Sequence, residues 1–198
     1  MINHKHKAIF VRVPKTAGSS MRRCIEKRGF GAVEYHAPDG SNDNVTGVYV
    51  NGAAWRIKRN LLSVWDDYFK FAFVRNPWDR MVSCWANRGR RCGDFETFLR
   101  GYPYPQNKHD LVWHTIPQLT HMTDDGGNNM MDFIGRFENL QEDFNTICDK
   151  IGISQKTLPH VNKSKHKHYT EYYDDETKQI VAEKYAKDIE YFGYEFGD

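Results

Sequence analysis

Apolar and β-branched residues recur in three short runs along the chain, at residues 8–13, 69–74 and 132–137. The first two runs are apolar almost throughout, which is typical of strands buried on both faces of a parallel sheet. Residues 33–35 predict a further short strand. Each of the three longer runs is followed by turn residues and then by a helical segment. The pattern therefore predicts strands that alternate with helices.

The helical segments are marked by capping residues as well as by apolar stripes. Ser, Asn and Asp side chains stand where each helix should begin, and such residues accept hydrogen bonds from the N–H groups of the first turn. The expected caps are Ser19 or Ser20, Asn76, Asp94, and Asp174 or Asp175. The helices are expected up to about residue 28, at 55–62, 77–87, 95–100 and 139–151, and in one final helix with Ile180, Val181, Tyr185 and Ile189 facing inward.

This alternation predicts an α/β fold with a mostly parallel sheet and flanking helices. The chain has 198 residues, of which 39% are hydrophobic, so it can bury a core of its own. We therefore expect a single domain that spans residues 1–198.

The charge and cysteine content exclude several classes of protein. With 28 basic and 26 acidic residues the net charge is only +2, so we expect no binding of nucleic acid through overall charge. The four cysteines form no C-x-x-C pair, and the His-Lys-His triplets at 4–6 and 166–168 lack metal-ligand partners nearby. The first apolar run is too short for a signal peptide or a membrane span, so a cytoplasmic location is expected.

The first candidate site is the loop at residues 14–20, Pro-Lys-Thr-Ala-Gly-Ser-Ser, between a strand and a helix. Small residues let successive backbone N–H groups surround an anion at the helix N-terminus. Lys15 adds positive charge, and Thr16, Ser19 and Ser20 add hydroxyl donors. The Walker pattern is absent because the lysine precedes the glycine, so no magnesium ligand is defined. The alternative is an ordinary turn with an exposed lysine.

The second candidate site begins with Arg75 at the carboxyl end of the predicted second strand, where ligand crevices of α/β folds lie. Positions 76, 80 and 83 share one face of the following helix. Arg75 and the hydroxyl of Ser83 are therefore candidates for holding a phosphate. The alternative is a structural ion pair between Arg75 and Asp79.

Taken together, the two motifs resemble those of sulfotransferases that use 3′-phosphoadenosine 5′-phosphosulfate (PAPS). PKTAGSS is similar to the loop that holds the 5′-phosphosulfate, and FVRNPWDRMVS is similar to the 3′-phosphate motif. RFENL at 136–140, LPHVNKS at 158–164 and DIEYFGY at 188–194 resemble segments of Golgi-type carbohydrate sulfotransferases and their bacterial and phage relatives. The likeness covers nearly the whole chain and implies a doubly wound fold related to P-loop kinases.

The resemblance also implies a cofactor and a set of site residues. PAPS would donate a sulfuryl group to a hydroxyl of a carbohydrate or glycolipid, PAP would leave, and no metal would be required. The residues implied are Lys15, Thr16, Ala17, Gly18, Ser19 and Ser20 for the 5′-phosphosulfate, Arg75 and Ser83 for the 3′-phosphate, and Asn162, Lys163, Ser164 and Lys165 in a loop over the nucleotide. Lys15 would also neutralise charge on the leaving oxygen.

The base that activates the acceptor has two histidine candidates. His36 follows the first helix and the predicted short strand, where relatives carry a Lys-His or Tyr-His element. His114 lies in a segment that resembles the His-x-x-Pro-Gln segment of the family. Either histidine could instead orient a loop, and Asp39 and Asp43 could replace His36. A positioned base contributes about a hundredfold to ten-thousandfold in rate.

Two other functions remain open at this point. A small-molecule or nucleotide kinase would share the fold, but it needs a lysine after the glycine and a magnesium ligand. A non-catalytic protein that binds nucleotides or glycans would keep the anion loop without a working base. The acceptor pocket would be shaped by residues 37–51 and 88–125, where the basic run at 88–91 is either a solvated surface or a contact for an anionic sugar.

Overall fold

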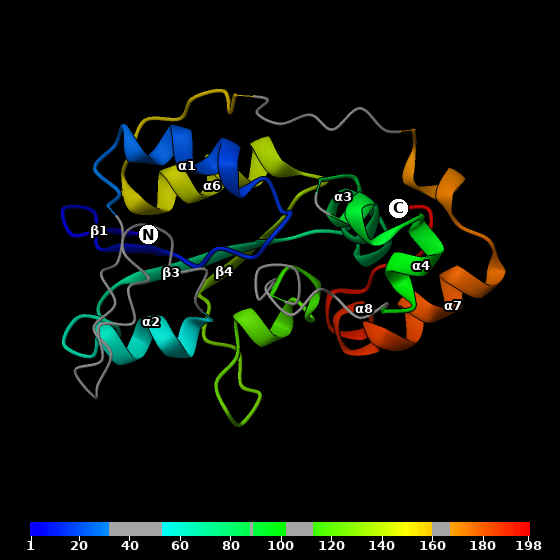
Figure 1. Cartoon of the computed structure of the whole chain (residues 1–198). Coiled ribbons are helices and arrows are strands. Elements are labelled where there is room, and N and C mark those ends of the chain that lie inside the picture. Colours follow the sequence, from blue (N-terminus) through cyan, green and yellow to red (C-terminus); the bar gives the residue numbers. More distant parts are fainter. Residues whose placement is uncertain (32–52, 88, 102–112, 160–166) are drawn as a thin grey trace.

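Four strands form one sheet in the computed structural model, which describes residues 1–31, 53–87, 89–101, 113–159 and 167–198 (Figure 1). Their spatial order is β1 (Ile2–Asn3), β2 (Ala8–Phe10), β3 (Phe69–Val74) and β4 (Phe133–Arg136). β1 pairs antiparallel with β2, whereas β2, β3 and β4 pair in parallel. The predicted mixed α/β fold with a mostly parallel sheet is confirmed.

The observed strands differ from the predicted ones mainly in length. β3 has the predicted bounds, and β4 is one residue shorter at each end. β2 stops at Phe10, although Val11 still donates its N–H to Phe71 O at 2.9 Å and remains buried with Val13. The apolar run thus reflects burial beyond the point where regular strand pairing ends. Residues 33–35 lie outside the described residues.

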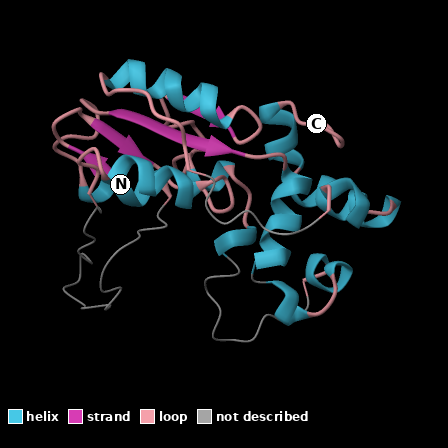
Figure 2. Cartoon of the chain, turned by 90° about the horizontal axis from the view of Figure 1, so that it is seen from above, coloured by secondary structure: helices cyan, strands magenta, loops and turns pink. Residues whose placement is uncertain are grey.

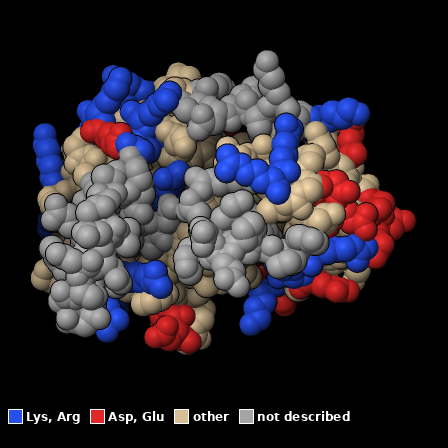
Figure 3. Space-filling view, viewed as in Figure 1, with Lys and Arg blue, Asp and Glu red and all other residues tan. Residues whose placement is uncertain are grey.

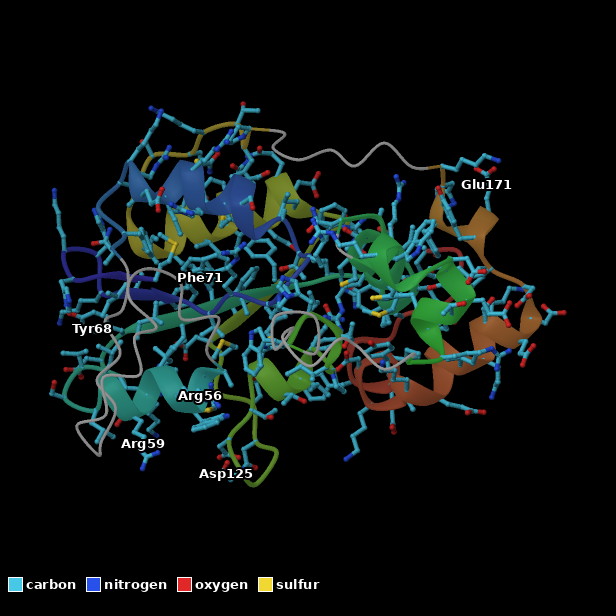
Figure 4. The ribbon with its side chains drawn as sticks, viewed as in Figure 1. Arg56, Arg59, Tyr68, Phe71, Asp125 and Glu171 are labelled. Carbon is cyan, nitrogen blue, oxygen red and sulfur yellow. The ribbon has the colours of Figure 1, made fainter. Side chains whose placement is uncertain are left out.

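Helices cover both faces of the sheet, as its alternating side chains require (Figures 1 and 2). One face packs Phe10, Phe71 and Phe73 against α1 (Gly18–Glu26) and α6 (Leu140–Ile151). Figure 4 labels Phe71 within this layer. The opposite face packs Ile9, Val11, Ala72 and Val74 against α2 (Ala54–Asn60) and the chain around Trp65.

The remaining described helices gather beyond the carboxyl ends of the parallel strands (Figures 1 and 2). They are α3 (Pro77–Asn87), α4 (Phe95–Leu99), α7 (Asp175–Lys184) and α8 (Ala186–Phe192), with the 3-10 turns η1 (Gly89–Cys92), η2 (Leu119–His121) and η3 (Tyr169–Tyr172). A third apolar cluster, with Trp78, Phe98, Val181 and Tyr185, holds these elements together except η2, whose Leu119 packs on the cluster that also contains Ile57 of α2. This cluster fixes the helices that surround the end of β3.

Two of the predicted helix features need correction. The final helix is interrupted at Tyr185, so that α7 and α8 are separate. The break buries Tyr185, whose hydroxyl donates to Thr115 O at 2.5 Å. The caps at Asn76, Asp94 and Asp174 are confirmed by hydrogen bonds from the first-turn N–H groups of their helices, whereas the predicted serine cap of α1 is wrong.

Candidate functional site

The two motifs predicted to bind anions meet at the carboxyl edge of the sheet. β2 and β3 are parallel neighbours, so the loop after β2 and Arg75 after β3 emerge at the same edge. Arg75 Nη1 donates a hydrogen bond to Lys15 O at 3.2 Å. The structure therefore brings the loop at residues 14–20 and Arg75 together, although they lie 60 positions apart.

The backbone of the loop is bent in a way that few non-glycine residues adopt. Lys15 and Ala17 have φ angles of 70° and 62°, in the left-handed region. Such a conformation costs a residue with a side chain about 1–2 kcal/mol. Backbone strain of this kind concentrates at functional sites, where it turns N–H groups toward a ligand. The loop geometry thus fits an anion cradle better than an ordinary turn.

The N-terminus of α1 is not occupied by a side-chain cap. The helix begins at Gly18 with Ala17 as its N-cap, and this N-cap residue makes no side-chain capping hydrogen bond. Ser19 and Ser20 therefore lie inside the first turn, which corrects the predicted cap. First-turn N–H groups without internal partners are a binding site for anions.

Side chains of the loop differ in how deeply they are buried. Lys15, Ala17 and Ser19 are half-buried, whereas Thr16 and Ser20 are buried. The hydroxyl of Thr16 donates to Val13 O at 3.0 Å, so it stabilises the loop itself. Thr16 has two hydrogen-bond donors. Its hydroxyl is used within the loop, so its backbone N–H is the donor that we consider for an anion.

Arg12 is a cationic residue that the sequence patterns did not single out. A Cβ atom at Gly18 would lie 2.6 Å from Arg12 Nε, so the arginine side chain crosses directly over this glycine. A side chain at position 18 would therefore force the Arg12 side chain to move. The only sequence signal was an arginine that interrupts an otherwise apolar run.

Arg75 forms the ion pair with Asp79 that was predicted as the alternative. Its Nε and Nη2 atoms both lie 2.7 Å from Asp79 Oδ2, and the guanidinium lies 3.9 Å from the ring centroid of Phe137. A guanidinium has five N–H groups. The described contacts with Asp79 and Lys15 use three, so the ion pair orients Arg75 and still leaves donors for a ligand.

The helix face shared by positions 76, 80 and 83 serves mainly as structure. The amide of Asn76 donates to Glu195 O at 2.8 Å, and the fully buried Arg80 donates to His114 O and Ile116 O at 3.2 and 2.6 Å. Ser83 is buried on α3, and no described contact joins it to Arg75.

Of the two histidine candidates for the base, the structure describes His114 and does not describe His36. His114 is buried, and its carbonyl oxygen accepts hydrogen bonds from Arg80 and from the thiol of Cys84 at 3.3 Å. These contacts fix its segment against α3. His36, with Asp39 and Asp43, lies outside the described residues, as do the predicted loop residues Asn162, Lys163, Ser164 and Lys165.

A group of buried polar atoms without partners lies beside this segment. Of the five such side-chain atoms in the described ranges, four are Arg80 Nε, Trp113 Nε1 and the two ring nitrogens of His121. His121 packs edge-to-face on Trp113 with ring centroids 4.7 Å apart, and burial lowers its pKa to about 3. Arg56, labelled in Figure 4, lies over the rings of Trp55 and Trp113, and its Cζ atom is 5.0 and 5.7 Å from their centroids.

Charged side chains are distributed unevenly over the surface. On the face shown in Figure 3, acidic side chains gather over α7 and η3, where Glu171, Asp175 and Glu176 lie. Basic side chains are spread over the rest of that face. The described residues contain no group of three or more metal-ligating side chains and no helix long and apolar enough to cross a membrane.

Comparison with known proteins extends these observations to nearly the whole chain. An uncharacterized protein of Archaeoglobus fulgidus is 30% identical over 120 residues, which cover 59% of this chain and 95% of that protein. No solved structure matches the chain. The sequence pattern of the Sulfotransferase family matches residues 1–195, and the chain therefore belongs to the Sulfotransferase family.

Proposed function

We propose that this protein transfers a sulfuryl group from PAPS to a hydroxyl group of a carbohydrate or glycolipid. The observation that carries the proposal is the hydrogen bond from Arg75 Nη1 to Lys15 O, which joins the two anion motifs at one edge of the sheet. PAPS carries two separate anionic groups, the 5′-phosphosulfate and the 3′-phosphate. Two cationic motifs that meet in this way are suited to such a nucleotide.

Each motif then has a distinct part in binding. The N–H groups of residues 15–20, at the N-terminus of α1, hold the 5′-phosphosulfate, with Lys15 beside it. Arg75 holds the 3′-phosphate, together with Ser83, and the loop at 162–165 closes over the nucleotide. We also propose that the fold is related to the P-loop kinases, because a strand, an anion loop and a helix follow one another in the same order.

The reaction follows from these positions. The acceptor oxygen attacks sulfur, the bond between sulfur and the 5′-phosphate oxygen breaks, and its electron pair leaves with PAP. Lys15 neutralises the charge that develops on that oxygen, and a histidine takes the proton of the acceptor hydroxyl. His36 is the first candidate for this base and His114 the second. As in phosphoryl transfer, most of the rate enhancement comes from positioning and electrostatics.

Thermal unfolding with different nucleotides tests the proposal. PAP should raise the Tm well above any effect of ATP or AMP, because a ligand that binds only the folded state stabilises it. Equal shifts with ATP and PAP would instead favour a kinase. PAPS turnover with a panel of sugar acceptors then separates a sulfotransferase from a protein that binds the nucleotide without reaction.

A further inference from the structure

The main chain of Arg75 is held by the side chain of Gln118. Gln118 Oε1 accepts a hydrogen bond from the Arg75 N–H at 2.9 Å, and Gln118 Nε2 donates to Arg75 O at 2.9 Å. Arg75 directly follows the last residue of β3. The amide of Gln118 thus pairs with Arg75 as one residue of an adjacent strand would, and it fixes the backbone from which the arginine side chain extends.

Gln118 is itself held by a residue of α8. The carboxylate of Asp188, fully buried, accepts from the N–H groups of Gln118 and Leu119 at 2.6 and 3.0 Å. A carboxylate at the start of η2 also interacts favourably with the exposed N–H groups there. Three segments far apart in the sequence are therefore linked in the order Asp188, Gln118, Arg75.

The next residue of the chain is held from another side. Asn76 donates its N–H to Glu138 Oε1 at 2.7 Å, and Glu138 Oε2 accepts from the hydroxyl of Tyr194 at 3.0 Å. The two peptide groups at the end of β3 are thus clamped by side chains from separate elements. When such a partner is removed, a backbone group at the strand end is left without its hydrogen bond, and this cost favours a shift of the strand end.

We propose that Gln118 and Asp188 are positioning residues that hold Arg75 where it contacts the 3′-phosphate of the nucleotide. The inference rests on the proposed function. The guanidinium already bonds to Asp79 and Lys15 O, so a displaced backbone at Arg75 would misdirect the remaining N–H groups. The loop at 14–20 follows β2 and is also held by contacts of its own, such as the bond from the Thr16 hydroxyl to Val13 O at 3.0 Å, so contacts with the 5′-phosphosulfate should change less than those with the 3′-phosphate.

The affinities for PAP and for adenosine 5′-phosphosulfate, which lacks the 3′-phosphate, test this by calorimetry. Gln118→Met keeps the length of the side chain and removes both hydrogen bonds to Arg75. We expect it to weaken PAP binding about tenfold, which is less than the full loss of a hydrogen bond to a charged group. The affinity for adenosine 5′-phosphosulfate should change less than about twofold. Asp188→Asn should shift the same ratio in the same direction.

Two comparisons separate positioning from general damage to the fold. Val181→Ala removes packing in α7, close to α8, and should lower the Tm without changing the ratio of the two affinities. In an Arg75→Ala background, Gln118→Met should cause no further loss of PAP affinity, because both substitutions act through one contact. Equal loss for both ligands, or full additivity with Arg75→Ala, would overturn the proposal.

The same affinity measurements distinguish a failure of the proposed function from a failure of the positioning inference. If Arg75→Ala alone left the ratio of affinities unchanged, the 3′-phosphate role of Arg75 would be wrong, and the positioning roles would fall with it. If Arg75→Ala changed the ratio but Gln118→Met and Asp188→Asn did not, only the positioning inference would be overturned. Thermal unfolding of each variant confirms that the folded protein is being measured.

Discussion

The Arg75 guanidinium has two hydrogen-bond partners among the described residues, and both affect what it can bind. The pair with Asp79 restricts the guanidinium to one direction, and the bond to Lys15 O ties it to the loop. A charged side chain held in this way loses less freedom when it meets a phosphate. The ion pair and the phosphate site, which the sequence left as alternatives, are therefore compatible.

Single substitutions at the two histidines should identify the base. We expect His36→Ala to lower kcat about a hundredfold or more while PAP affinity is kept, because a base acts on the acceptor. In the active enzyme kcat should fall at acidic pH, since only a neutral imidazole accepts a proton. Steady-state kinetics across pH and calorimetry with PAP measure both quantities.

The matched variant is His114→Ala. The side chain of His114 is buried, which favours a structural role, and His114→Ala keeps the backbone carbonyl that Arg80 and Cys84 bind, so the loss of kcat should be smaller. If His114→Ala abolished turnover while His36→Ala did not, the two roles would be exchanged. If neither mattered, Asp39 would become the candidate, and the acidic fall in kcat would lie well below the histidine range.

At the scale of elements, local signals predicted structure well and long-range contacts could not be predicted. Asn76 and Asp94 are caps because their side chains bond within three residues, which a sequence pattern can show. The break at Tyr185 depends on Thr115, 70 positions away, and the serine cap of α1 failed because the loop takes left-handed angles at Lys15 and Ala17. Such outcomes depend on packing and not on propensity.

The pairing of β3 with β4 provides a test at this scale. A Cβ atom at Gly135 would lie 2.5 Å from the ring of Phe73, which is fully buried. We expect Gly135→Ala to lower the free energy of unfolding by about 1–3 kcal/mol, the cost of overpacking a core. Urea unfolding measures this change. Gly31→Ala is the matched control, because a Cβ there meets nothing within 4 Å, and a similar loss in both variants would contradict the explanation.

At the scale of the whole molecule, three apolar clusters hold the elements that carry the candidate site. Two clusters cover the faces of the sheet, and the third joins α3, α4 and α7 beyond its end. Lys15 and Arg75 could be predicted because each follows a recognisable apolar run. Gln118 and Asp188 could not be assigned positioning roles, because 43 and 70 positions separate the partners in their hydrogen bonds.

Stability of the whole fold should depend on pH through His121. Burial lowers its folded pKa to about 3, whereas an unfolded histidine titrates near 6.5. Between these values the unfolded state binds the proton more readily, so the free energy of unfolding should fall as pH drops below about 6.5. The slope from this one group is at most about 1.4 kcal/mol per pH unit.

The comparison of the wild-type protein with His121→Phe isolates that contribution. Phenylalanine keeps an aromatic ring against Trp113 and removes two ring nitrogens that have no partner in the described structure. Urea unfolding between pH 7 and pH 5 should then show a flatter dependence in the variant, because the other titrating groups are shared by both proteins. At pH 7 the variant should be no less stable, since no hydrogen bond is lost. An unchanged slope would mean that His121 takes up its proton in the folded state, and that water or another ligand reaches its ring.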